Sequence, residues 1–79
     1  QKAIEIHRAG RQLDYAQALG ELGSTYFLQG DADRGLPAWQ EALRIAGDAG
    51  LASEAVLWAR NLAGAYAQRG DWDAAERYN

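Results

Sequence analysis

The sequence predicts an all-α fold built from helical repeats, and three observations support this. First, the chain resembles itself at a shift of 40 residues. Second, apolar residues recur at the three- and four-residue spacing that places them on one face of a helix. Third, no segment alternates apolar with polar residues as a strand does, and Val56 is the only valine.

Both copies of the repeat share identical residues at equivalent positions. Each copy also carries a stripe of apolar residues that is expected to pack in the interior. The identical pairs are Leu22/Leu62, Tyr26/Tyr66, Gly30/Gly70, Asp31/Asp71 and Asp33/Asp73. The stripe of the first copy is Tyr15, Leu19, Leu22 and Tyr26, and its counterpart in the second is Ala55, Ala59, Leu62 and Tyr66.

Five helical segments are expected. Residues 1–9 have the pattern of the end of a helix. Asp14 followed by Gln17 is typical of a capping box, so a second helix is expected to begin there. Residues 47–50 separate the third helix from the fourth, for which Ser53 is the expected cap.

The second and fourth helices are each followed by a glycine and an aspartate. Gly30 and Gly70 suit the left-handed conformation that ends a helix. Asp71 is expected to open the fifth helix, because a carboxylate caps free N–H groups and favours the positive end of the helix dipole. The two glycines of "GELG", residues 20–23, are expected to allow close helix approach.

Pro37 lies near the start of the third helix, which either Asp31 or Asp33 can cap. If Asp31 is the cap, Pro37 removes a helical hydrogen bond. If Asp33 is the cap, the missing N–H falls at or next to a position without a helical partner. We expect the second arrangement, with a shifted or 3₁₀-like start near Arg34.

Size and charge limit the classes of function. The chain of 79 residues makes at most one small domain, with 48% apolar residues and a net charge of −3. The 8 basic residues are scattered among 11 acidic ones, which argues against nucleic acid as a partner. No apolar run reaches the roughly 20 residues of a membrane span, so no membrane partner is expected.

The repeat boundaries divide the chain into three parts. We expect residues 1–13 to end a preceding repeat, residues 14–50 to form a full repeat, and residues 51–79 to form an incomplete one. The first residue is Gln1, and both ends interrupt a helical pattern. The sequence is therefore expected to be a slice of a longer array.

The two copies resemble the tetratricopeptide repeat over nearly the whole chain. The residues of the first copy that carry the resemblance are Leu19, Leu22, Gly23, Tyr26, Gly30, Asp31, Trp39, Ala42 and Leu43. Those of the second are Leu62, Ala63, Tyr66, Gly70, Asp71 and Ala75. The resemblance implies a right-handed αα solenoid with truncated ends, whose concave face is lined by the first helix of each repeat.

The repeat departs from the family in its length, which is about 40 residues instead of 34, and in lacking the usual proline after its second helix. Gly35 stands where the family has a small alanine, and Ala59 where it has a large residue. Longer repeats of this kind are similar to those of bacterial signal-transduction ATPases and large transcriptional regulators, and the kinesin light chain type is longer as well.

The resemblance also implies a partner-binding groove. Its positions are Gln17, Gly20, Glu21, Ser24, Phe27 and Leu28 in the first copy, and Leu57, Arg60, Asn61, Gly64, Ala67 and Gln68 in the second. Some family members hold a terminal carboxylate with a Lys and Asn clamp. Here Gly20 and Ser24 occupy the first-copy positions and only Asn61 matches, so binding of chaperone tails is disfavoured.

No cofactor, metal site or catalytic set is expected. A calcium loop counted from Asp31 would need Gly and Glu where Leu36 and Ala42 stand, so helix capping explains the paired aspartates better. His7 is the only histidine, so a zinc site lacks a second histidine ligand. A catalytic triad could use His7 only with Ser24 or Ser53, and neither serine lies in a G-x-S-x-G elbow. We expect His7 to face solvent.

The expected function is therefore a non-enzymatic module that binds a protein or peptide, within a larger, bacterial, cytoplasmic regulatory protein. Two alternatives remain: a spacer or self-association element acting through uncovered repeat ends, and a sensor for an attached ATPase or DNA-binding domain. Trp58 and Trp72 can each be core residues or exposed binding anchors, with the core favoured.

Overall fold

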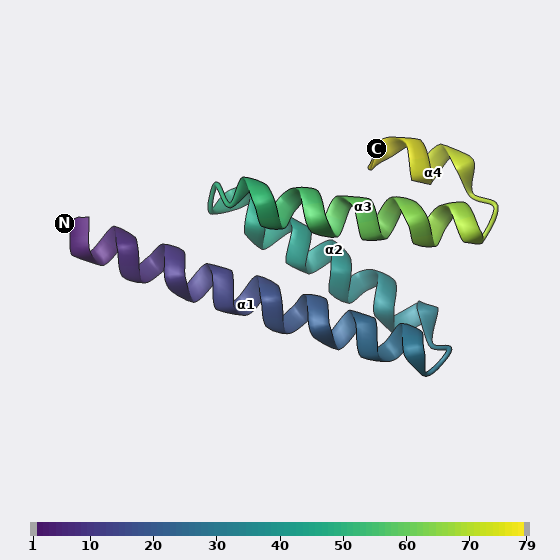
Figure 1. The fold of residues 1–79 in the computed structure, drawn as a ribbon, viewed down its shortest axis with the longest axis horizontal. Helices are drawn as coiled ribbons and strands as arrows, with labels where there is room; N and C mark the ends of the chain where they lie inside the picture. Colours follow the sequence, from purple (N-terminus) through teal and green to yellow (C-terminus); the bar gives the residue numbers. More distant parts are fainter. Residues whose placement is uncertain (1, 79) are drawn as a thin grey trace.

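A computed structural model describes the backbone of residues 2–78 and the side chains of residues 10–78. In this range the chain forms four helices, namely α1 (Lys2–Leu28), α2 (Ala32–Asp48), α3 (Ala52–Gln68) and α4 (Trp72–Arg77). Consecutive helices run antiparallel, and the first part of α1 extends beyond the others (Figure 1). The expected all-α repeat fold is confirmed.

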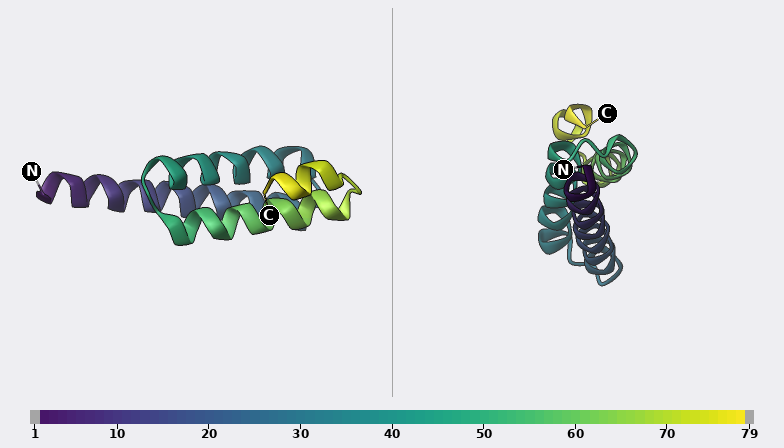
Figure 2. Two further views of the ribbon diagram at one scale, coloured as in Figure 1. Left: turned by 90° about the horizontal axis from the view of Figure 1, so that it is seen from above. Right: turned by 90° about the vertical axis from the view of Figure 1, so that its left-hand side faces the viewer.

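The helices stack so that α2 packs against both α1 and α3. Figure 2 shows α2 along one side of the α1–α3 pair, whose other side stays open. The short α4 packs on α3. The first helices of the two repeats, α1 and α3, therefore border a side of the molecule that no described second helix covers.

The expected break before Asp14 is absent, because α1 continues from Lys2 to Leu28. One glycine inside a helix, here Gly10, costs only about 1 kcal/mol relative to alanine, and residues 11–13 are good helix formers. Asp14 and Gln17 lie inside α1 and cap nothing. The predictions of a capping box and of five separate segments are wrong.

The turns between helices are alike, as predicted for Gly30 and Gly70. Both adopt φ of 78°, and Gly50 adopts 71°. The residue after the glycine donates its N–H to the carbonyl five residues earlier in the chain. Asp31 donates to the Tyr26 carbonyl at 2.8 Å, and Asp71 donates to the Tyr66 carbonyl at 2.9 Å. This is the Schellman ending that a left-handed glycine permits.

Two of the three described helix starts carry an aspartate cap. Asp31 accepts from the Arg34 N–H at 3.2 Å, and Asp71 accepts from the Ala74 N–H at the same distance. The α3 helix differs, since its first flanking residue is Leu51 and no side chain caps it. The prediction that Ser53 caps this helix is wrong, because the helix has already begun before it.

The start of α2 also differs from the arrangement that we expected. Asp31 is the cap and α2 is α-helical from Ala32, so Pro37 lies inside the helix. The missing N–H leaves the Asp33 carbonyl without its helical donor. Asp33 and Pro37 are both exposed, and water can therefore hydrate that carbonyl.

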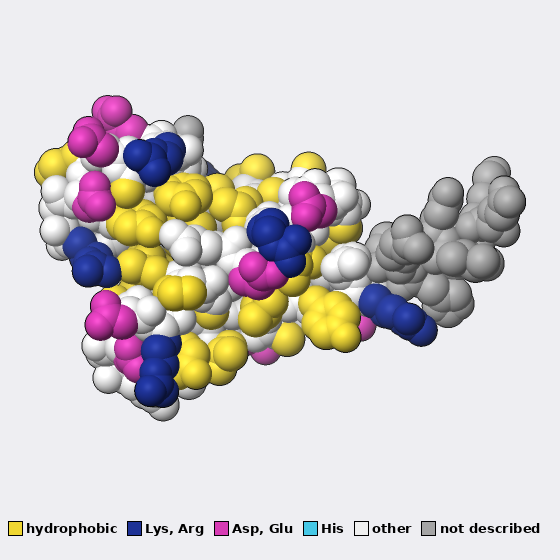
Figure 3. Space-filling view, turned by 180° about the vertical axis from the view of Figure 1, so that it is seen from behind, with side chains coloured by type: hydrophobic (Ala, Val, Ile, Leu, Met, Phe, Trp, Pro, Cys, Tyr) yellow, Lys and Arg dark blue, Asp and Glu magenta, His cyan; other side chains and the backbone are white. Residues whose placement is uncertain are grey.

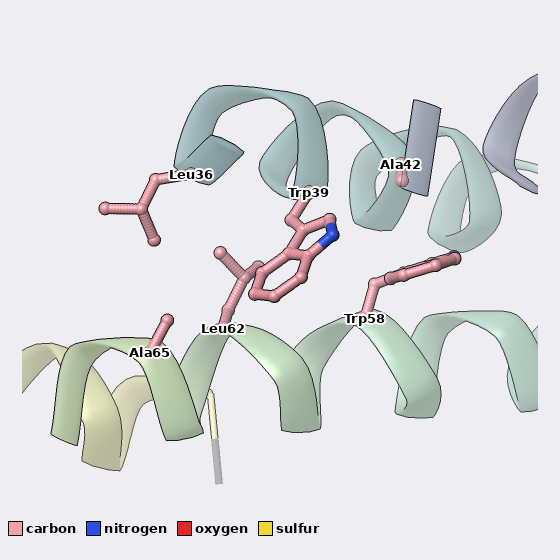
Figure 4. Close-up of a cluster of buried hydrophobic side chains, with 6 residues drawn as sticks. All are labelled: Leu36, Trp39, Ala42, Trp58, Leu62 and Ala65. Carbon is pink, nitrogen blue, oxygen red and sulfur yellow. The ribbon is translucent and has the colours of Figure 1, made fainter. Parts of the chain in front are cut away.

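The core is a cluster of six buried side chains from α2 and α3: Leu36, Trp39, Ala42, Trp58, Leu62 and Ala65. They point toward one another between the two helices (Figure 4). The Trp39 and Trp58 rings lie 6.4 Å apart, and Phe27 of α1 stacks on Trp39 at 4.2 Å. Aromatic rings from three consecutive helices thus form one row.

The α1 helix contributes a face of small residues to this core. Trp39 Nε1 donates to the Gly20 carbonyl at 2.9 Å. A Cβ on Gly23 would lie 2.5 Å from Trp39 Cδ1, and a Cβ on Gly20 would collide with the Trp58 ring. The expectation that "GELG" allows close helix approach is therefore confirmed.

The larger apolar stripe of α1 lies beside this face, not on it. Tyr15 is 62% exposed and Leu22 is 45% exposed, although both were expected in the interior. Tyr26 is half-buried. The assignment of the stripe to the core is wrong for its two exposed members, because α1 buries small residues to make room for indole rings.

The close approach of α1 to Trp58 generates a stability prediction. Gly20→Ala is expected to destabilise the fold by about 1–3 kcal/mol, as overpacking of a filled core does. Gly64→Ala is the matched control, since nothing lies within 4 Å of a Cβ at this exposed helix position. It is expected to stabilise by up to about 1 kcal/mol. Thermal unfolding of both variants tests this, and equal or higher stability for Gly20→Ala would contradict it.

An exposed ion triplet lies in the second half of α2. Arg44 donates to Glu41 Oε1 from Nε at 3.0 Å, and to Asp48 Oδ2 at 3.1 Å. The hydrogen bonds from Arg44 hold the pKa of the Glu41 carboxyl below its ordinary value of 4.5. The same contact raises the pKa of Arg44.

The triplet generates a prediction about pH. A carboxyl group whose pKa is lower in the folded state than in the unfolded state stabilises the fold at pH values above its unfolded-state pKa. This contribution is lost as the pH falls through its folded-state pKa. The difference in melting temperature between the chain and Glu41→Gln should therefore be small at neutral pH, and shrink as the pH falls below 4.5. A difference that grows on acidification would contradict this assignment.

Candidate partner-binding groove

The open side of α1 and α3 carries two matching rows of side chains. On α1 the row is Gln17, Glu21, Ser24 and Leu28, and on α3 it is Leu57, Asn61, Gly64 and Gln68. Both rows have the spacing of four, three and four residues that keeps side chains on one helix face. Ser24 and Asn61 are half-buried and the others are exposed. We call these two rows the groove.

The groove combines apolar and polar side chains. Leu28 is 90% exposed and Leu57 is 44% exposed. The Ser24 hydroxyl donates to the Gly20 carbonyl at 3.1 Å, so it is held against its own helix. The two helices touch between the rows, where Trp58 packs on Gly20. The surface can offer apolar anchors and hydrogen-bonding groups to an extended peptide or a helix.

Four of the expected groove positions lie outside the two rows, and one of them, Ala67, is half-buried. Phe27 is half-buried, with its ring on Trp39 and in the space that a side chain on Gly35 would need. Gly20 is buried beneath Trp58. Arg60 is exposed and occupies the position equivalent to Gly20, one residue outside the α3 row. Phe27 is thus a packing residue, and replacing it would disturb the core as well as any bound partner.

A hollow of about 450 Å³ lies at one end of the groove, where α1 passes the start of α3. Its lining residues are Leu13, Gln17, Leu51, Ala52, Ser53 and Glu54. We call it the groove hollow. Glu54 Oε1 is buried without a hydrogen-bond partner among the described residues, and so is Trp58 Nε1 one turn further along α3.

Sequence reasoning placed Glu54 in the first turn of its helix but did not assign it to the groove. A signal was present, because Glu54 precedes Leu57 and Asn61 by three and seven residues and so extends the α3 row by one turn. The family pattern provided no such position. Only the passage of α1 near this turn makes Glu54 part of the groove hollow.

A second surface lies on α1 itself. We define the outer stripe as Tyr15, Ala18 and Leu22, which are all exposed. In Figure 3 hydrophobic side chains lie along the lower edge of the molecule, and a basic side chain separates them from the grey segment. A depression of about 440 Å³ beside the stripe is lined by Arg11, Asp14, Tyr15 and Ala18. In the second copy α2 covers this face, and Leu62, the counterpart of Leu22, is fully buried.

The tryptophans differ in burial. Trp58 is 6% exposed and belongs to the core. Trp72 is 67% exposed at the start of α4, so the favoured core placement is wrong for it.

Along the face in Figure 3, acidic and basic side chains are intermixed.

Other predicted features can be placed only in part. The side chain of His7 lies outside the described residues. Asp71 acts as a helix cap, as predicted, whereas α2 is capped by Asp31 and not by the expected Asp33. Within the described residues, no group of three or more His, Cys, Asp or Glu side chains could hold a metal ion. None of the helices there has the length and apolar character needed to cross a membrane.

Comparison with known proteins adds one finding. A family model described as tetratricopeptide repeat matches residues 14–79. No curated protein and no solved structure matches the chain. The matched range covers most of the chain, including the groove, the core row of aromatic rings and all three glycine turns. The chain therefore belongs to the tetratricopeptide repeat family, whose repeats generally mediate protein–protein interactions.

Proposed function

We propose that the chain is a non-enzymatic scaffold module that binds a peptide or a helix of a partner protein along the groove. The observation that carries this proposal is the pair of matching rows on α1 and α3. They repeat one spacing, face the side left open by α2, and include Leu28 and Leu57 as exposed apolar residues. Apolar side chains beside polar ones are typical of surfaces that recognise peptides.

The wider setting is also a proposal. The longer repeat supports a place within a larger bacterial regulatory protein in the cytoplasm, where the module binds a neighbouring domain or a separate partner. It could also act as a sensor for an attached ATPase or DNA-binding domain. The mixed charge of the surface supports protein over nucleic acid as the partner of this segment.

The groove assignment is tested with peptides selected from a random display library against the folded chain. Replacing both Leu28 and Leu57 with serine is expected to weaken binding of the selected peptides by about tenfold or more. A tenfold loss corresponds to about 1.4 kcal/mol of binding free energy. Titration calorimetry measures the affinity. Both residues are well exposed, so the double variant should keep the parent melting temperature.

Val56→Ser is the matched control for this experiment. Val56 is 55% exposed, comparable to Leu57, but consecutive helix residues point about 100° apart. Its replacement should leave the affinity unchanged. If Val56→Ser weakened peptide binding as much as the double leucine replacement, the groove assignment would be contradicted. If no peptide could be selected against the folded chain, the proposed function would be contradicted.

Self-association is the second candidate, and the outer stripe supports it. The same face of the second copy is covered by α2, whereas Tyr15 and Leu22 are exposed. Ala18 lies between them. Two copies crossing antiparallel at this small residue would place Tyr15 of each beside Leu22 of the other.

This candidate predicts a concentration-dependent dimer. Analytical ultracentrifugation should detect the dimer at high concentration, and Leu22→Glu should abolish it, because a carboxylate would be buried against apolar residues. Leu28→Glu is the control, since that leucine lies on the groove and should leave the dimer intact. A monomer at every concentration would contradict self-association through the outer stripe.

A further inference from the structure

We propose that the groove hollow binds the cationic side chain of a lysine or arginine in the partner peptide, with the Glu54 carboxylate as its counter-ion. This inference rests on the proposed function and deepens it by assigning the chemistry of one residue of the ligand. It concerns the end of the groove where α1 passes the first turn of α3.

The Glu54 carboxylate is the group in the hollow that lacks a hydrogen-bond donor in the described part of the chain. Its Oε1 atom is buried and has no hydrogen-bond partner among the described residues. An ionised carboxylate only accepts hydrogen bonds, so burial without a donor costs free energy. The terminal torsion of glutamate is soft, and either oxygen can therefore turn toward the hollow. A donor entering from a partner would satisfy this atom.

The walls of the hollow fit a long basic side chain. Leu13, Leu51 and Ala52 provide apolar contact for a methylene stem, which lysine and arginine bury readily while their charge stays at the tip. Gln17 and Ser53 add side-chain oxygens that can accept from an ammonium or guanidinium group. The volume of about 450 Å³ is ample for one such side chain.

The charge of the site favours a cation over the other candidate, an anion at the start of α3. No side chain caps this helix, so its first N–H groups could attract a carboxylate. The Glu54 carboxylate lies in that same first turn and would repel one. None of the described lining residues is basic. A ligand that carries a positive charge meets no like charge in the lining.

Nuclear magnetic resonance tests the inference with a small probe. N-acetyl-lysine N-methylamide is titrated into the ¹⁵N-labelled chain, with the norleucine analogue as the uncharged probe of similar length. The lysine probe is expected to shift the Ser53 amide and the Trp58 indole N–H in a saturable manner. The norleucine probe should bind at least tenfold more weakly.

Three variants locate the charge. Glu54→Gln is expected to weaken the lysine probe at least tenfold, whereas Glu76→Gln, which removes an equal charge from the exposed surface of α4, should leave the affinity unchanged. Gln17→Lys supplies an ammonium group from α1. It should compete with the probe and raise the melting temperature, and this result does not depend on how Glu54→Gln folds.

Equal binding of the two probes, or equal loss in the two glutamate variants, would overturn the inference. So would library peptides that bind the groove without a lysine or arginine requirement, a result that leaves the proposed function standing. A library without binders, combined with saturable lysine binding at Glu54, would contradict the proposed function and support the cation site.

Discussion

The structure depends on the insertion of two indole rings between helices whose facing surface is glycine. Trp39 donates its indole N–H to the Gly20 carbonyl, and the Trp58 ring occupies the space that a side chain on Gly20 would need. The bond fixes α2 on α1, and the ring fixes α3 on both. Because the interior is close-packed, the positions of these rings set the spacing of the three helices, and hence of the two rows of the groove.

The fold was largely predictable because its turns follow local rules. Gly30 and Gly70 adopt the left-handed conformation that few other residues tolerate, and Asp31 and Asp71 cap the next helices. The errors arose where local signals compete with packing. A plausible capping sequence at Asp14 did not interrupt α1, and the apolar stripe of that helix was mistaken for its buried face.

The candidate groove was predictable from the family pattern only as a set of positions. Sequence alone could not show that the Phe27 ring stacks on Trp39, because that contact depends on the missing side chain of Gly35. Nor could it show that α1 and Glu54 line one hollow, since the two come together only through the stacking of three helices. The groove is thus a surface whose apolar and charged parts are set by the core beneath it.

The most direct test of this account is hydrogen exchange at the three indole N–H groups, followed by nuclear magnetic resonance. The Trp39 N–H is buried and bonded to Gly20, so it should exchange only through global unfolding. Trp72 is 67% exposed and should exchange at the rate of a free indole, which provides an internal reference. Exchange of the Trp39 N–H as fast as that of Trp72 would contradict the claim that this contact holds the helices together.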